Sequence, residues 1–114
     1  MIPKTKLYRN KAYLRWVVSN PCCVCGTDNE VQSHHIIGHG TSGMALKSDD
    51  RLSCSLCHTH HVELHIQGHQ TFDAKYRTMN TPAQLHFVNL TLGRARIQKK
   101  LTPELIVEAR ELIK

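Results

Sequence analysis

The sequence predicts a small α+β protein that is mostly helical, with a zinc-clipped core between N-terminal and C-terminal helices. Three observations lead to this expectation. Cysteine and histidine residues gather between residues 21 and 68, at the short spacings typical of metal sites. Within that region, residues 31–37 (VQSHHII) have the composition of a strand. The residues on either side show helical spacing of apolar residues together with helix-capping sequences.

The length and charge of the chain indicate one domain, residues 1–114, with a polyanionic partner. Fifteen Lys and Arg stand against nine Asp and Glu, which gives a formal net charge of +6. Such a balance favours nucleic acid over a membrane surface, although basic groups can also be solvated helix faces. We expect DNA contacts from two groups of basic residues, which are Lys4, Lys6, Arg9 and Lys11 near the start and Arg94 and Arg96 late in the chain.

The pattern of apolar residues favours a cytoplasmic protein with no membrane partner. No apolar segment is long enough for a membrane span, and MIPKTKLYRN lacks the apolar centre of a signal peptide. Disulfides are rare in the cytoplasm, and five cysteines at short spacing are there more often metal ligands.

The N-terminal part begins with a basic helix within residues 1–20, expected over 4–19 and ended by Pro21. The segment PCCVCG is predicted to form a metal-binding knuckle in which Gly26 takes a positive φ. A strand over 31–37, a glycine-rich loop and a second strand beginning at RLSC should follow.

Helices should account for most of the remaining chain. Helical spacing extends from Ser55 to Gln67, and Gly68 is a plausible C-terminal stop. Residues 69–114 are expected to be helical, with Thr81 and Thr102 each starting a helix as N-cap before a proline.

The first candidate metal site is structural. Cys22 and Cys25 form a C-x-x-C pair, and two later pairs can complete it. Cys54 with Cys57 would give four cysteines, whereas Cys57 with His60 would give three cysteines and one histidine. We favour the second set for a structural zinc ion, because it leaves the following histidines free for another ion. A closed set of four ligands contributes folding energy and leaves no position for substrate.

A second candidate site consists of histidines. His61 and His65 are four residues apart and would lie on one face of a helix. His34 and His35 are adjacent on the expected strand, so their side chains should point to opposite faces. One imidazole could join the helical pair on a metal while the other remains a free base, as metal-assisted hydrolysis requires.

These motifs together resemble a known family of nucleases. The arrangement PCCVCG, SHHIIGHGTSGM and SLCHTHHVELH, covering residues 21–66, is similar to the HNH (ββα-metal, His-Me finger) endonucleases. Within them it resembles a small phage and prophage group that includes the RecA-dependent nuclease Ref. The resemblance implies a ββα-metal core over residues 21–68. It also implies that His35 is the general base and that His34, His61 and His65 hold the catalytic metal.

The resemblance leaves one catalytic position open. The middle residue of the motif is usually Asn, and here Asp50 falls at about the right distance after His35, with Asp49 as a neighbouring candidate. An aspartate could fix the tautomer of His35 and support the imidazolium, or it could become a fourth metal ligand.

The resulting expectation is a metal-dependent endonuclease that hydrolyses DNA phosphodiester bonds. The resemblance implies a catalytic magnesium or manganese ion, while three imidazoles also suit zinc. The alternative is a non-catalytic zinc-binding module that holds nucleic acid or a recombinase. A recombinase filament is a candidate partner under either reading, and the oligomeric state stays open.

Overall fold

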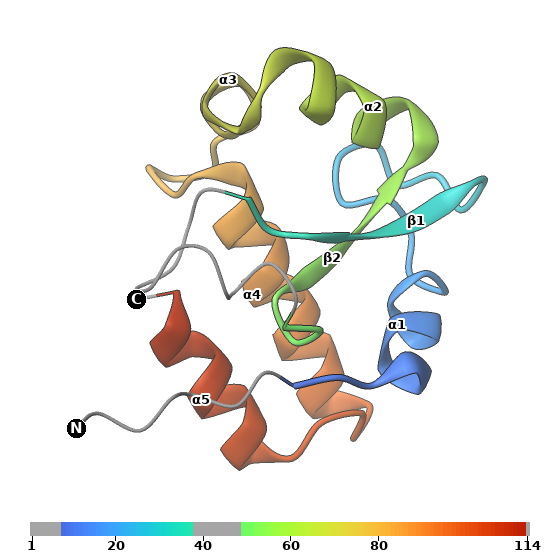
Figure 1. Ribbon diagram of the computed structural model, residues 1–114, viewed down its shortest axis with the longest axis vertical. Helices are drawn as coiled ribbons and strands as arrows, with labels where there is room; N and C mark the ends of the chain where they lie inside the picture. The colour runs from blue at the N-terminus through green and yellow to red at the C-terminus, as the bar shows by residue number, and fades with distance from the viewer. Residues whose placement is uncertain (1–7, 38–48, 114) are drawn as a thin grey trace.

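The computed structural model describes residues 8–37 and 49–113, which form five helices and two strands (Figure 1). Lys4, Lys6 and the glycine-rich loop expected after residue 37 lie outside these ranges. The elements are, in chain order, α1 (Lys11–Val17), β1 (Val31–His35), β2 (Ser53–Cys57), α2 (His58–Gln67), α3 (His69–Lys75), α4 (Ala83–Ile97) and α5 (Pro103–Leu112). The expected α+β class and the excess of helix are confirmed.

The two strands form an antiparallel pair that directs the adjacent histidines of β1 to opposite faces. In this register His34 lies opposite Cys54, and His35 lies opposite Ser53. The side chain of His34 is buried, whereas His35 is only half-buried. Every residue of β2 is buried, and α2 begins directly after its last residue, Cys57.

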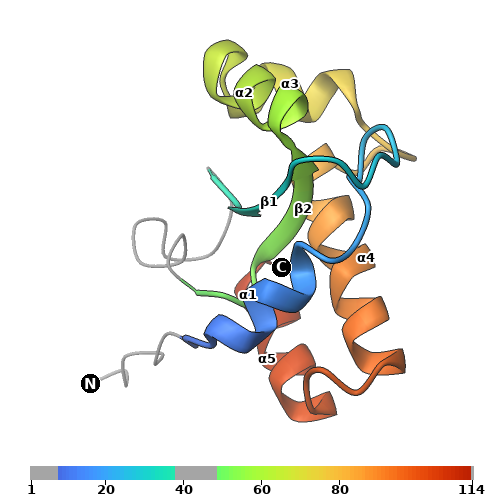
Figure 2. The ribbon, with the colours of Figure 1, turned by 90° about the vertical axis from the view of Figure 1, so that its right-hand side faces the viewer.

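The helices enclose β2 and form one core. Helices α1, α2 and α4 pack against β2, while α3 and α5 pack against α4 (Figures 1 and 2). The side chains at the centre are at most 2% exposed and come from α1, β2, α3, α4 and α5; examples are Val17, Leu56, Phe72, Leu92 and Ile106. Burial of these side chains against one another is the main stabilising contribution that a domain of this size can offer.

Helix α1 is shorter than the sequence predicted. Its N-cap is Asn10, whose side chain accepts from the backbone N–H of Tyr13 at 3.0 Å. The backbone N–H of Asn10 donates to the carboxylate of Asp50 at 2.7 Å, so residue 10 is held outside the helix by a tertiary contact. The helix ends at Val17, four residues before Pro21.

Helix α2 also begins later than expected. Ser55 pairs with Ser33 across the sheet, so residues 55–57 belong to β2 and the helix starts at His58. The predicted stop is confirmed, because Gly68 takes a φ of 90° and α3 follows at once. Gly26 in the knuckle likewise has the positive φ that was expected, 77°.

The C-terminal helices differ in how they begin. The hydroxyl of Thr102 accepts from Leu105 N at 3.2 Å, which confirms the predicted N-cap of α5. The prediction that Thr81 caps α4 was wrong. The first turn of α4 is capped by a residue of α3, because the carboxylate of Asp73 accepts from the backbone N–H of Gln84 at 2.9 Å. Within the described ranges, no helix is long and apolar enough to cross a membrane.

Candidate metal centres

The first candidate centre joins the knuckle to the start of α2. The ligand atoms of Cys22, Cys25, Cys57 and His60 all lie within 4.8 Å of one another. Cys22 and Cys25 flank the knuckle turn, which is closed by a hydrogen bond from Gly26 N to the carbonyl of Cys22 at 2.9 Å. Cys57 ends β2, and His60 lies in the first turn of α2.

The distances within this cluster suit zinc. Two thiolates at about 2.3 Å from one tetrahedral zinc ion lie about 3.8 Å apart. The sulfurs of Cys25 and Cys57 are 3.9 Å apart, and Nδ1 of His60 is 3.7 Å from Cys22 Sγ and 3.1 Å from Cys57 Sγ. The cluster can therefore hold a structural metal such as zinc. It contains His60 and excludes Cys54, which is fully buried on β2.

The second candidate centre lies between β1 and α2. Nε2 of His61 is 3.2 Å from Nδ1 of His34 and 3.2 Å from Nε2 of His65. Two imidazole nitrogens that share a zinc ion at about 2.1 Å lie about 3.4 Å apart. His34 is buried, His61 is half-buried and His65 is exposed, so one side of the cluster faces solvent. The three expected histidines are brought together, with room for further ligands.

The side-chain amide of Gln84 determines which nitrogen of His34 faces this cluster. Gln84 Nε2 donates to the carbonyl of Ile37 at 3.0 Å and to the carboxylate of Asp73 at 3.1 Å. The amide oxygen accepts from Ile37 N at 2.9 Å and from Nε2 of His34 at 2.9 Å. A nitrogen that donates to this oxygen carries the ring proton, so Nδ1 of His34 presents its lone pair to the cluster.

His61 is oriented in the same way from the other side. Its Nδ1 lies 2.7 Å from the amide oxygen of Gln32, which leaves Nε2 as the nitrogen without a proton. Burial lowers the pKa of His34 to about 4, against the opposing effect of its hydrogen bond to Gln84, and burial also lowers the pKa of His61. Neutral imidazoles whose second nitrogens donate to protein oxygens have the form that metal ligands need.

His35 is paired with a carboxylate on the opposite face of β1. Its Nε2 lies 2.9 Å from Oδ1 of Asp50. Asp50 is fixed in turn, because Oδ2 accepts from Asn10 N at 2.7 Å and its backbone N–H donates to the carbonyl of Tyr8 at 2.8 Å. A carboxylate that accepts from Nε2 holds the ring proton there and leaves Nδ1 able to take a proton.

The neighbouring Asp49 has a different role. Its carboxylate accepts from Arg51 Nη2 at 2.7 Å and Nε at 3.0 Å, and Arg51 also reaches Glu108 on α5 at 3.0 Å. Of the two aspartates considered from the sequence, Asp50 is therefore the partner of His35. Among the described residues, neither aspartate joins the histidine cluster.

The expected DNA-binding residues fall into two groups that the fold brings close together. Trp16 Nε1 on α1 donates to the side chain of Gln98 at 2.8 Å, so the end of α1 lies beside the end of α4. Arg9, Lys11 and Arg96 are exposed, and Arg94 is half-buried. The N-terminal segment and the end of α4 also meet at one pocket, which Tyr8 and Arg96 both line.

Comparison with known proteins places the chain in a family. Residues 1–95 match the family described as Protein of unknown function (DUF968). The chain belongs to the DUF968 family. It is also similar to the uncharacterized protein YdfU of Escherichia coli strain K12, with 40% identity over 75 residues that make up 66% of this chain and 21% of YdfU. The chain thus spans about one fifth of the length of that relative, and no solved structure matches it.

Sequence reasoning missed the residues that support the candidate histidine cluster and the His35–Asp50 pair from a distance. Gln84 stands 50 residues after its partner His34, and Asn10 stands 40 residues before Asp50. Neither belongs to a motif, and glutamine and asparagine are common on helices and at caps. Only the clustering of chemically matched partners in the fold reveals them.

Proposed function

We propose that this DUF968 protein is a metal-dependent endonuclease of the HNH type that hydrolyses DNA phosphodiester bonds. The observation that carries the proposal is that the side chains of His34 and His35, which are adjacent on β1, point to opposite faces of the strand. His34 points into a cluster of three imidazoles, while His35 points to the carboxylate of Asp50. A candidate metal position and an oriented base thus lie on neighbouring residues of one strand, as metal-assisted hydrolysis requires. The succession β1, β2, α2 agrees with what the resemblance implies.

His35 would act as the general base. Nδ1 of His35 would take a proton from the attacking water while the water oxygen bonds to phosphorus. The bond from phosphorus to the 3′ oxygen would break, and the 3′ oxygen would take a proton from solvent. The carboxylate of Asp50, 2.9 Å from Nε2, stabilises the imidazolium that forms. Asp50 is almost completely buried while His35 is partly exposed, so the base can meet solvent and its partner is held rigidly.

The donor set of the histidine cluster fits a divalent metal ion. A bound ion would supply Lewis acidity to the scissile phosphate and to the leaving oxygen. His34, His61 and His65 would hold it, and the exposed side at His65 leaves room for phosphate oxygens and water. Three imidazoles suit zinc and manganese better than magnesium, while the resemblance favours magnesium or manganese. Activity should therefore be measured with manganese as well as with magnesium.

Plasmid nicking by purified protein tests the proposal. Wild-type protein and His35→Ala are compared with magnesium, with manganese and without added metal. We expect metal-dependent nicking that falls by roughly a hundredfold or more in the variant, because general-base catalysis contributes that much. His58→Ala, an exposed histidine at the start of α2, is the matched control and should nick like wild type. DNA binding by His35→Ala should persist.

The second candidate is a non-catalytic zinc module that binds nucleic acid or a recombinase. It is supported by the cluster of three cysteines and one histidine, which is complete without the other histidines. Such a module would show binding but no nicking with any metal. A recombinase filament is added before that result is accepted, because a partner could deliver the DNA. Nicking that appears only with the filament would support a partner-dependent nuclease.

A further inference from the structure

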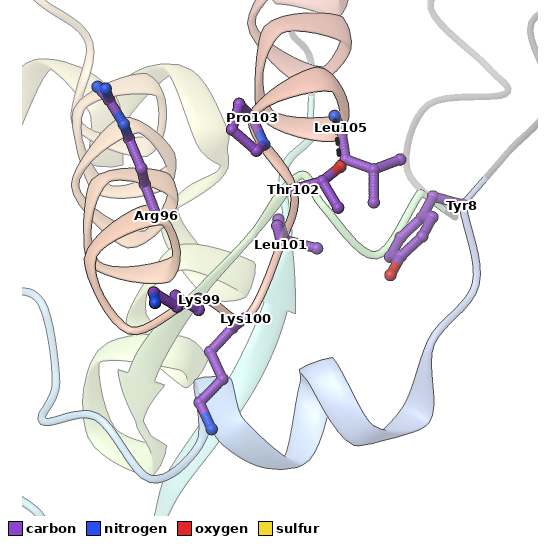
Figure 3. Close-up of a pocket in the computed structure, with 8 residues that line it drawn as sticks. All are labelled: Tyr8, Arg96, Lys99, Lys100, Leu101, Thr102, Pro103 and Leu105. Carbon is purple, nitrogen blue, oxygen red and sulfur yellow. Dashed lines mark hydrogen bonds between the residues drawn. The ribbon is translucent and has the colours of Figure 1, made fainter.

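A pocket of about 550 Å³ lies at the turn between α4 and α5 (Figure 3), and none of its lining residues belongs to either candidate metal centre. We call it the α4–α5 pocket; it is lined by Tyr8, Arg96, Lys99, Lys100, Leu101, Thr102, Pro103 and Leu105. Pockets of this volume are in the range that binds small organic molecules. Of the described lining residues, three are cationic and none is acidic.

The lining of the pocket has two chemically different parts. Figure 3 shows the side chain of Leu105 extending toward the ring of Tyr8, which gives an apolar and aromatic side. Lys99 and Lys100 lie on the other side of Leu101 and are exposed. A ligand that matches both parts needs a flat apolar group joined to negative charge. A nucleotide has this combination.

The ring of Tyr8 is fixed in place before any ligand arrives. Its hydroxyl accepts from Asn10 Nδ2 at 2.7 Å. The guanidinium carbon of Arg51 lies 5.5 Å from the centre of the ring, and Arg51 does not line the pocket. The ring therefore has a buried cationic neighbour on one side and the pocket on another. Rigid aromatic rings beside cationic groups are the usual stacking surface for unpaired bases.

Lys99 occupies a backbone position that usually belongs to glycine. Its φ is 57°, and the N–H of Lys100 donates to the carbonyl of Ala95 at 2.8 Å, which closes the end of α4. Helices commonly end with glycine in this left-handed conformation, because a side chain there is strained. A lysine at this position costs stability and places a cation at the edge of the pocket. Such local conflicts tend to occur at functional sites.

We propose that the α4–α5 pocket binds one unpaired nucleotide of a DNA strand. The base stacks on Tyr8 and Leu105, and the neighbouring phosphates contact Arg96, Lys99 and Lys100. The proposal rests on the proposed function, because its ligand is a strand of the nucleic acid that the histidine cluster would cut. It adds a preference for single-stranded DNA at a site outside the metal centres.

The position of the pocket suits a strand that also reaches the histidines. Gln84, which holds His34, lies in the first turn of α4, and Arg96 follows it by twelve residues, or about 18 Å along the helix. That distance corresponds to roughly five nucleotides at the 3.4 Å spacing of a duplex strand, and to fewer nucleotides of an extended single strand. The carbonyl of Tyr8 also accepts from the backbone N–H of Asp50, the partner of His35. The same short segment thus borders the pocket and holds the partner of the general base.

Fluorescence anisotropy with a labelled oligothymidylate tests the pocket, in the absence of added divalent metal. Lys99→Gly should raise the melting temperature, because it relieves the strained φ, and yet weaken binding. A variant that becomes more stable cannot have lost affinity through misfolding. The slope of log affinity against log salt should fall by roughly 0.7 for the lost phosphate contact. Arg110→Ala, an exposed charge outside the pocket, is the matched control and should bind like wild type.

A matched pair of ligands separates base stacking from phosphate binding. An oligomer of the same length without bases keeps every phosphate, and wild-type protein should bind it about fivefold or more weakly than oligothymidylate. Tyr8→Leu should abolish that difference, whereas Tyr8→Phe should retain it. Duplex DNA should bind more weakly than the single strand, because its bases are already stacked.

Equal affinity of Lys99→Gly and Arg110→Ala for oligothymidylate would overturn the proposal. Equal binding of the two oligomers by wild-type protein would also overturn it. Displacement of the probe by inorganic phosphate as readily as by thymidine monophosphate would do the same, because it would indicate a site for simple anions. Because binding is measured without the catalytic metal, these results are independent of nicking. If wild-type protein fails to nick both with and without a recombinase filament, and Lys99→Gly weakens oligothymidylate binding, the pocket is supported and the nuclease is rejected.

Discussion

The amide oxygen of Gln84 lies 2.9 Å from Nε2 of His34, and both side chains are buried in the core. The same oxygen accepts from the backbone N–H of Ile37, while the amide nitrogen is engaged by Ile37 O and by Asp73. Gln84 thus joins the end of β1, α3 and the start of α4 around one imidazole of the candidate histidine cluster. Such partners of ligand histidines commonly change metal affinity by about 10–100-fold when they are removed.

Replacing Gln84 should therefore weaken the histidine cluster specifically. Gln84→Leu leaves the ring N–H of His34 and the backbone N–H of Ile37 without an acceptor, so we expect a stability loss of about 1–3 kcal/mol or more. Manganese affinity at the cluster should fall about 10–100-fold in calorimetric titration, while zinc remains bound at the cysteine cluster. Gln67→Leu, exposed at the end of α2, serves as control. Unchanged manganese affinity in Gln84→Leu would contradict the role given to this amide.

Asp50→Asn should show what the carboxylate partner of His35 contributes, because the variant keeps His35 itself. The asparagine can still accept from Asn10 N, so the fold should persist, but it holds the imidazolium of His35 less well. We expect nicking to fall by roughly a hundredfold or more. Asp28→Asn, an exposed aspartate, should have the activity of wild type. Nicking by Asp50→Asn at the rate of wild type would remove Asp50 from the mechanism.

The cysteine cluster should be required for folding. Structural zinc sites contribute roughly 10 kcal/mol or more of binding free energy, so Cys25→Ser should lose tightly bound zinc and melt at a much lower temperature. Cys23→Ser makes the same substitution two residues away, outside the cluster, and should retain one equivalent of tightly bound zinc. Elemental analysis and thermal denaturation measure the two effects. Equal zinc content in the two variants would show that the cluster is not a metal site.

The stability of the protein without metal at the histidines should fall as the pH is lowered. Burial lowers the pKa of His34 from its ordinary 6.5 to about 4. Between these values the unfolded chain binds a proton that the folded protein does not, so stability is lost as the pH falls through this range. The full effect is about 3 kcal/mol.

Urea unfolding of His34→Gln at neutral and at mildly acidic pH isolates this contribution. The variant retains the cysteine cluster, so acid effects on zinc are common to both proteins. Its stability should depend less on pH than that of wild type, and His58→Gln should retain the dependence of wild type. Parallel pH dependences of wild type and His34→Gln would show that this imidazole is not the group responsible.

The sequence by itself determined the features that depend on local spacing. The C-x-x-C pair, the spacing from Cys57 to His60 and from His61 to His65, and the alternation of His34 and His35 follow from turn, helix and strand periodicity. The cap at Thr102 and the positive φ of Gly26 likewise depend only on nearby residues. These are interactions between residues that are close in the chain, so the sequence pattern alone was enough to place them.

Only the tertiary structure decided which distant groups complete each site. It paired His35 with Asp50 and not with Asp49, placed Gln84 against His34, and started α2 at His58, three residues after the expected start at Ser55. Contacts across 40–50 residues depend on how whole elements pack, and packing is set by the shape of the buried core. Such a contact leaves no periodic pattern in the sequence. A single glutamine or asparagine outside any motif cannot be recognised from the sequence as the partner of a distant residue.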